Sequence, residues 1–245
     1  MKSQVQDKFS EFYNQWLNQH EANLKELLSV PRDPSHDQLH RALVSKVGTH
    51  YKQYYTMKWA AAQLDVLGIF CPTWFTPLEN AYHWITGWKP SMLFRLITSL
   101  RQTRFPGPSL VDMTDEQMKQ IEDLQLRIRI EEDRVDREME RQQVSIADKP
   151  MVELARLATQ VKNGEVVGEL DKYVDMTLSS LLAGLERVMK KADCVRLMAM
   201  KGVLEVLNPL QSLDFLTATV MLQIQLRKAG KRRDQGKMMI MNHKD

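Results

Sequence analysis

Hydrophobic residues recur at the three- and four-residue spacing of α-helices along most of this chain. The first such stripe predicts a helix that ends before Pro31, because the residue before a proline avoids the helical region. A second helix is predicted from about His36 to about Leu67, with Ser35 and Gln38 as a capping box at its start. The apolar stripe of the first helix consists of Phe9, Phe12, Tyr13, Trp16, Leu17, Leu24, Leu27 and Leu28.

Prolines and capping residues divide the middle of the chain. Thr76 is placed as an N-cap, Pro77 follows at the first helical position and Glu79 at the third, which predicts a short helix that ends near Gly87. The next helix is predicted from Pro90-Ser91 to about Arg101.

Three tryptophans, Trp74, Trp84 and Trp88, fall within fifteen residues of this middle segment. Tryptophan buries a large area and needs a partner for its indole N–H. One interpretation is a structural cluster that pins several helices together. The other is a groove for a ligand or a protein partner.

A very polar helix is predicted after a linker from Thr103 to Met113. Thr114 and Gln117 form a capping box at its start, and it continues to about Ile146. Its apolar seam is Ile121, Leu124, Ile128 and Val135, while Glu131 and Glu138 occupy the other seam positions. The helix either lies across a bundle with a solvated outer face or forms a coiled coil in a homodimer.

The last third predicts a short helix over Met151–Val161, a turn at Asn163-Gly164 and a helix over Leu170–Met189 that continues to Leu207 if nothing breaks it. The last helix is predicted over Asp214–Lys228. No segment shows the alternation of apolar and polar residues that is typical of a β-strand. The expected fold is therefore all-α, a bundle of long and short helices joined by short loops. It comprises one domain over 1–229 and a basic, flexible tail over 230–245.

Composition narrows the class of protein. The 245 residues are 43% hydrophobic, enough for a sizeable core, and the net charge of +3 is too small to indicate nucleic-acid binding by itself. The two cysteines imply no disulfide framework, and the polar start has no apolar signal region. We expect an intracellular protein of the nucleus, the cytoplasm or both.

No catalytic motif is present, so we expect no enzyme, no catalytic residue and no metal site. His36 and His40 have a spacing that suits a metal, but no further ligands are fixed nearby. His83, between Tyr82 and Trp84, is interpreted as a packed or hydrogen-bonded side chain. Cys71 is interpreted as a small buried hydrophobe rather than a redox thiol.

The densest positive run lies near the C-terminus. Its functional interpretations are nuclear import or contact with an acidic surface, and the alternative is a solubilising tail. No heptads follow it, so we expect no sequence-specific DNA binding. The run comprises Arg227, Lys228, Lys231, Arg232, Arg233 and Lys237.

Three blocks of residues follow one another along the chain. The N-terminal block is Phe9, Phe12, Trp16, Leu24 and Leu27-Leu28, the middle block begins with Pro72-Thr73-Trp74 and Pro77-Leu78-Glu79-Asn80, and the late block begins at Leu204. The order and spacing of these blocks resemble the DOG (Delay of Germination) domain of plants. That domain occurs in seed-dormancy regulators and C-terminal to the bZIP of TGA transcription factors. The N-terminal block and the late block Leu204, Leu207, Pro209, Gln211 and Asp214-Phe215-Leu216 also match, so the resemblance spans essentially the whole chain. The middle signature, which is also the candidate groove, consists of Pro72, Thr73, Trp74, Pro77, Leu78, Glu79, Asn80, Trp84, Gly87, Trp88, Pro90, Ser91, Phe94 and Arg95.

The resemblance implies a stand-alone, non-catalytic regulator that acts through protein partners. The role implied first is transcription-linked or hormone signalling, in seed dormancy and abscisic-acid responses. Type 2C protein phosphatases and transcription factors are the implied partners. Phosphatase contact maps to the N-terminal helix, between Asp7 and Gln19, where the candidate residues are Phe9, Phe12, Tyr13, Trp16 and Gln19.

The resemblance leaves two further functions open and bears on cofactors. The alternatives are a factor that marks plasma-membrane domains during pollen aperture formation, with peripheral membrane contact, and a carrier of a small hydrophobic ligand. Relatives can hold a fatty-acyl chain in the apolar interior, and others bind haem through histidines on the last helix. This chain has Gln223 and Arg227 at the matching positions, so no haem is expected.

Overall fold

The computed structural model describes residues 4–161 and 167–241, and within these ranges it contains helices and loops but no strand. The all-α prediction is therefore confirmed. In chain order the helices are α1 (Gln4–Ser29), η1 (Pro34–His36), α2 (Asp37–Leu64), α3 (Val66–Phe70), α4 (Pro77–Ala81), α5 (Met92–Thr103), α6 (Asp115–Val144), η2 (Ser145–Ala147), α7 (Lys149–Val161), α8 (Val167–Val206) and α9 (Pro209–Met241).

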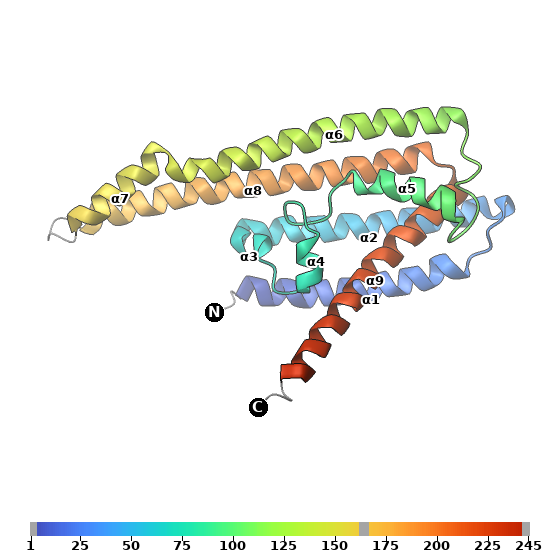
Figure 1. The fold of residues 1–245 in the computed structure, drawn as a ribbon, viewed down its shortest axis with the longest axis horizontal. Helices are drawn as coiled ribbons and strands as arrows, with labels where there is room; N and C mark the ends of the chain where they lie inside the picture. Colours follow the sequence, from blue (N-terminus) through green and yellow to red (C-terminus); the bar gives the residue numbers. More distant parts are fainter. Residues whose placement is uncertain (1–3, 162–166, 242–245) are drawn as a thin grey trace.

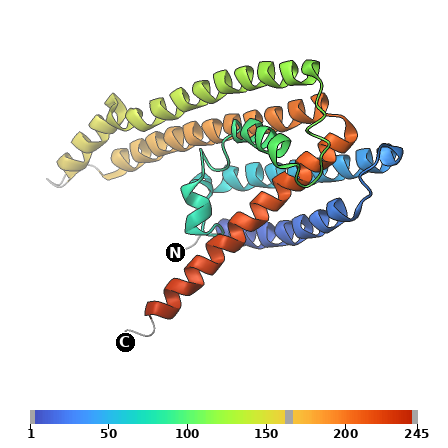
Figure 2. The same ribbon diagram turned by 45° about the vertical axis from the view of Figure 1, so that its right-hand side comes forward.

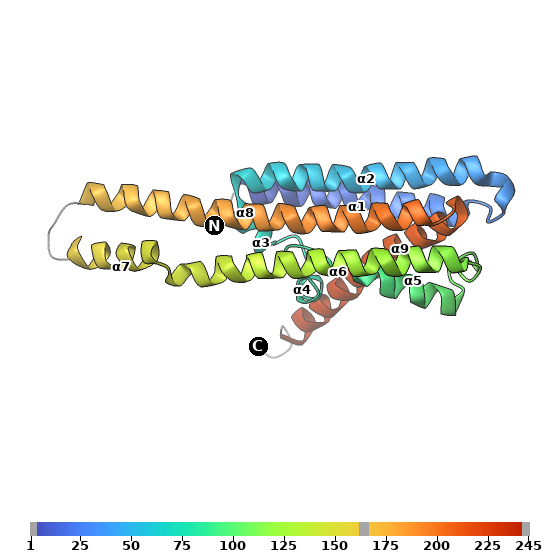
Figure 3. The ribbon, with the colours of Figure 1, turned by 90° about the horizontal axis from the view of Figure 1, so that it is seen from above.

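The long helices form two pairs, and α2 contacts α8 where the pairs meet (Figures 1 and 3). α1 and α2 lie side by side, and α6 packs along α8, with α7 against the first part of α8. α9 crosses diagonally and contacts both α1 and α2, while its C-terminal part projects from the body (Figure 2). Residues 211–220 of α9 are all buried, as expected for a helix surrounded by others.

The polar helix α6 uses its seam inside the molecule. Ile121, Leu124, Ile128 and Val135 are all buried, and α6 makes its main contact with α8. At Gly202 of α8 an added Cβ would lie 2.8 Å from the Leu124 side chain, so the glycine allows close approach. The interpretation of a helix across a bundle is confirmed, and the homodimer stays a prediction.

Capping residues set the helix starts at two of the three predicted places. Thr76 of α4 and Thr114 of α6 both form complete capping boxes, with Glu79 and Gln117 respectively. The predicted box of Ser35 and Gln38 is wrong. The Asp33 carboxylate instead accepts the Ser35 N–H and caps η1, so α2 follows at Asp37 without a side-chain cap.

Several predicted helix ends differ from those in the structure. The second helix stops at Leu64, because the Asp65 carboxylate caps a separate short helix, α3. α4 ends at Ala81 rather than near Gly87, and the next helix starts at Met92. The predicted continuation to about Leu207 is confirmed, because α8 runs unbroken to Val206. The predicted turn at 163–164 lies outside the described residues.

The last helix is longer than predicted. It begins at Pro209 and continues to Met241, instead of covering Asp214–Lys228 and then fraying. Pro209 suits the first helical position, where its missing N–H costs no helical hydrogen bond. The Asn208 side chain accepts the Gln211 N–H, and the Gln211 side chain accepts the Asn208 N–H.

Candidate functional site

The signature segment between α3 and α5 packs against α8 and α9. Trp74, Glu79, Pro90 and Phe94 are buried, Leu78, Trp84, Gly87, Trp88 and Ser91 are half-buried, and Arg95 is exposed. Pro72 is half-buried, while Thr73, Pro77 and Asn80 are exposed. The segment therefore supplies both core residues and surface.

Arg227 of α9 binds this segment from inside. Its Nη1 lies 3.2 Å from the Glu79 carboxylate and 3.0 Å from the Trp74 carbonyl oxygen. Its guanidinium also stacks over the Tyr13 ring. Placing Arg227 in an exposed basic run was therefore wrong, because this position of α9 faces α4 and the charge is neutralised internally.

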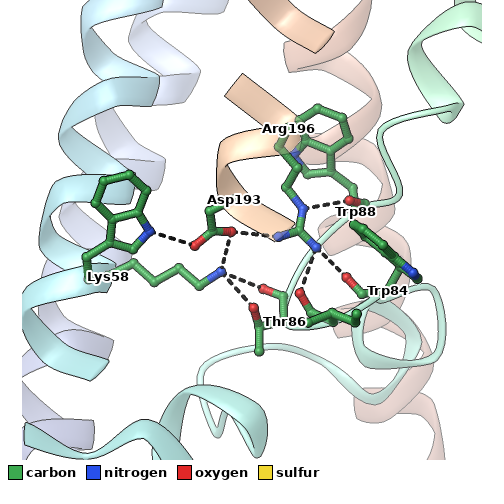
Figure 4. Close-up of polar contacts among 8 residues, drawn as sticks. Lys58, Trp84, Thr86, Trp88, Asp193 and Arg196 are labelled. Carbon is green, nitrogen blue, oxygen red and sulfur yellow. Dashed lines mark hydrogen bonds and ion pairs between the residues drawn. The ribbon is translucent and has the colours of Figure 1, made fainter. Parts of the chain in front are cut away.

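A buried ion network holds the next part of the segment (Figure 4). The Asp193 carboxylate on α8 accepts hydrogen bonds from Lys58 Nζ of α2 at 2.8 Å and from Arg196 Nη1 at 2.6 Å. Trp59 Nε1 donates to the other carboxylate oxygen at 3.0 Å. All three charged side chains are at most 2% exposed. Burial lowers the pKa of Lys58 to about 8 even though Asp193 counteracts it.

The two cations of this network fix the loop over residues 84–88. Lys58 Nζ donates to the carbonyl and the hydroxyl of Thr86. The Arg196 guanidinium donates to the carbonyls of Trp84, Ile85 and Trp88 (Figure 4). The loop is thus tied to two helices by charge-assisted bonds.

Sequence reasoning missed these three charges, although a signal was present. Lys58 lies on the buried stripe of α2 with Tyr51 and Tyr55, and Asp193 and Arg196 lie on the buried stripe of α8. Opposite charges on the apolar faces of two helices indicate an internal ion pair, because an unpaired buried charge is too costly.

The three tryptophans lie in different surroundings, and their role in binding a ligand or partner stays a prediction. Trp74 is a core residue, and Trp84 ties α6 to α8 because its Nε1 donates to Asp136 at 2.6 Å while Arg196 stacks on its ring. Trp88 lines a cavity of about 300 Å³. This cavity lies among α1, α2, the signature segment and α9, and its ring-bearing wall includes Tyr13, Trp16, Tyr51, Tyr54, Tyr55 and Phe75.

Only some of the predicted site residues line the cavity. Of the signature it contains Glu79, Gly87 and Trp88, and of the N-terminal set it contains Tyr13 and Trp16. The remaining signature residues build the surrounding structure or lie on the surface.

The N-terminal set points mostly inward. Phe9, Tyr13 and Trp16 are buried, Phe12 is half-buried against the core, and Gln19 is exposed. Trp16 stacks on both His20 and His50, whose rings also stack on each other, and its Nε1 donates to the His50 carbonyl. Any partner of α1 therefore meets its polar face and not its aromatic stripe.

Gln223 occupies the position that corresponds to one haem-ligating histidine of the relatives, and its side chain contacts two polar groups inside the protein. The Gln223 side-chain oxygen lies 2.8 Å from His20 Nε2 and accepts the Tyr51 hydroxyl at 2.9 Å. At the other position Arg227 is paired with Glu79. Neither side chain offers an imidazole, so these residues do not fit haem ligation, and absence of haem stays a prediction.

The remaining candidate side chains have partners or differ from expectation. His36 pairs with Asp33, and His40 Nε2 lies 2.8 Å from the Pro31 carbonyl oxygen. Within residues 4–161 and 167–241 no group of three or more metal-ligand side chains gathers. His83 packs edge-on against Phe75, as predicted. Cys71 was expected to be buried but is exposed, because the break after Phe70 turns it outward.

The exposed residues of the basic run lie towards the end of α9. Lys228, Lys231, Arg232 and Arg233 are exposed, and Lys228 pairs with Glu21 of α1. Among the described residues no helix is long and apolar enough to cross a membrane.

Comparison with known proteins places the chain in a family. Residues 20–99 match the family described as "DOG1: Seed dormancy control". The chain is 44% identical to Protein DOG1-like 4 of Arabidopsis thaliana, over 95% of this chain and 96% of the relative. It is 30% identical to Protein RESPONSE TO ABA AND SALT 1 of Arabidopsis thaliana, over 89% and 93%. It is also 27% identical to Transcription factor TGA2.3 of Oryza sativa subsp. japonica, over 82% of this chain and 56% of the factor. With a relative of this identity along nearly its full length, the chain belongs to the DOG1-like family.

Proposed function

We propose that this chain is a non-catalytic regulator in seed-dormancy or abscisic-acid signalling that acts by binding protein partners. The observation that carries the proposal is the near full-length relation to a DOG1-like protein and to a protein named for its response to abscisic acid and salt. Its expected location is the nucleus or the cytoplasm. Type 2C phosphatases and transcription factors are the partners to test.

The exposed face of α1 is the surface we assign to the partner. Its aromatic stripe is engaged in the core, so the side chains that a partner can reach are polar and carry both signs of charge. Such a face favours a specific, charge-complementary contact rather than hydrophobic association. Its members between the ends of the predicted contact region are Asp7, Lys8, Glu11, Asn14, Gln15, Asn18 and Gln19.

The double variant Glu11→Arg/Gln15→Arg should lose capture of a type 2C phosphatase from seed extract by about tenfold or more, because it reverses charge at the centre of this face. Affinity capture followed by quantitative mass spectrometry measures the loss. The matched control is Glu140→Arg/Gln143→Arg on α6, where both residues are also exposed. Equal capture of the phosphatase by both variants would mean that the contact lies on another surface. Recovery of neither phosphatases nor transcription factors by the unaltered chain would contradict the proposal.

A second candidate function is peripheral membrane contact during pollen aperture formation. The observation that favours it is the end of α9, which projects from the body and exposes Lys231, Arg232 and Arg233 (Figure 2). A basic residue near an anionic membrane surface contributes about 1 kcal/mol. These three residues would together supply about 3 kcal/mol of binding free energy.

The variant Lys231→Glu/Arg232→Glu/Arg233→Glu should abolish flotation with vesicles of phosphatidylserine and phosphatidylcholine. Flotation of the unaltered chain should also fall with rising salt, because the attraction is screened. The control makes the same charge change at three other exposed residues, Lys52, Arg127 and Arg129. If the unaltered chain does not float, or both variants float equally well, the membrane role fails.

A further inference from the structure

The aromatic cavity has a mouth and a floor of different chemistry. Tyr82, Met92 and Leu222 line it and are exposed, which places the opening between the signature segment and α9. Tyr51, Tyr55 and Lys58 line it and are buried, which places the floor at α2. A molecule would therefore enter past apolar side chains and end against tyrosines.

The size of the cavity limits its occupant. A protein cavity of about 150 Å³ lined by apolar side chains holds one benzene molecule. The cavity here measures about 300 Å³, twice that volume. It therefore suits a compact molecule of about two fused rings. Flat aromatic walls favour a planar molecule, because rings stack in offset or edge-on arrangements.

The charges of the lining argue against a charged occupant. Lys58, Arg196 and Asp193 all line the cavity. The three N–H groups of Lys58 are already taken by Asp193 and Thr86. Arg196 already donates to Asp193 and to three carbonyl oxygens of the loop over residues 84–88. Glu79 also lines the cavity and is paired with Arg227. An entering carboxylate would lose its hydration without finding a free counter-charge, which is costly. A neutral occupant avoids this cost.

The Tyr54 hydroxyl is a lining group that an occupant of the cavity could use. Tyr51 donates to Gln223, but within the described residues the Tyr54 hydroxyl forms no hydrogen bond. Burial raises the pKa of Tyr54 well above its ordinary value, so this hydroxyl stays protonated and available as a donor. Tyr54 is half-buried, so its hydroxyl can reach the interior of the cavity, where an acceptor on a bound molecule would give this donor a partner.

The geometry points to a small-molecule site in this cavity: it binds a neutral, planar, two-ring aromatic compound whose single oxygen accepts a hydrogen bond from the Tyr54 hydroxyl. This site is separate from the polar face of α1 that we assign to protein partners, so either can fail without the other.

Isothermal titration calorimetry of the full chain with 2-naphthol and with naphthalene tests the site. 2-Naphthol should bind, and Tyr54→Phe should weaken its binding by about five- to tenfold while changing naphthalene binding by less than about twofold. The phenylalanine keeps the ring contacts of Tyr54 with Phe9, Tyr13 and Tyr55, so the fold should be preserved.

A second pair of variants tests the position of the site. Leu222→Trp at the mouth should weaken both probes by about tenfold or more, whereas Gln225→Trp, exposed on the same helix and outside the lining, should leave both unchanged. 2-Naphthoate and palmitate, which are charged at neutral pH, should bind more weakly than 2-naphthol. The site is disproved if Leu222→Trp has no effect or Tyr54→Phe affects both probes alike. The assignment of a neutral planar ligand is overturned if either carboxylate binds as tightly as 2-naphthol.

Discussion

Replacing Asp193 by asparagine should lower the free energy of unfolding by about 3–5 kcal/mol. The change keeps the shape of the side chain but removes the counter-charge of Lys58 and Arg196, both nearly fully buried. Two cations would then lie close together without compensation. Because domains are stable by only about 5–15 kcal/mol, this one substitution is expected to remove a large part of the total. Urea denaturation followed by circular dichroism measures it.

Two further variants distinguish the loss of this buried carboxylate from the loss of an ordinary ion pair. Glu205→Gln breaks an exposed pair with Lys201 on the same helix and should cost less than about 1 kcal/mol. Lys58→Met should cost less than Asp193→Asn, because Arg196 then still pairs with Asp193. If Asp193→Asn were no more destabilising than Glu205→Gln, the network would not hold the fold.

The network also maintains an unfavourable loop conformation. Ile85 and Thr86 both have positive φ, 39° and 61°, although neither is a glycine. Such angles are rare for β-branched residues and persist only when surrounding contacts enforce them. Arg196 and Lys58 provide those contacts through the loop carbonyls. We therefore expect Asp193→Asn also to loosen the loop that carries Trp88 into the cavity wall.

Lowering the pH from 7 to 5 should reduce the free energy of unfolding by about 4–6 kcal/mol, which is the second large effect we expect. Burial lowers the pKa of His20 to about 3 and those of His50 and His83 to about 4. In the unfolded chain each titrates near its ordinary pKa of about 6.5. Below about pH 6.5 the unfolded chain binds more protons than the folded chain. The stability that the three neutral histidines contribute is therefore fully present above about pH 6.5 and falls as the pH approaches their pKa values in the folded chain. Each histidine contributes about 2 kcal/mol of this loss.

The variant His50→Phe should reduce the pH dependence by about a third, because it removes one of the three titrations. The ring of His50 stacks on Trp16, and phenylalanine can keep that contact. His36→Phe is the control, since His36 is only partly buried and pairs with Asp33 at the surface. Unfolding free energies measured at a series of pH values decide the matter. A flat profile between pH 7 and pH 5 would contradict the prediction.

Most of the long helices, their order and the family could be predicted from the amino-acid sequence. Spacing of apolar residues is a local property, so the stripes of α1, α2 and α6 could be read directly. The capping boxes at Thr76 and Thr114 are also local, because a threonine and an acceptor three residues later form the cap. The seam of α6 was visible in the same way, but whether it met α8 or a second copy was left open.

The partners of the polar and aromatic side chains could not be predicted without the folded structure. Lys58 and Asp193 lie 135 positions apart, and Arg227 and Glu79 lie 148 positions apart, so no local pattern pairs them. Arg227 was read as surface charge because sequence gives a residue's type but not the element it faces. The aromatic stripe of α1 was read as a binding surface, and packing instead placed it in the core and around a cavity. Burial and pairing depend on which helices meet, and only the folded chain fixes that.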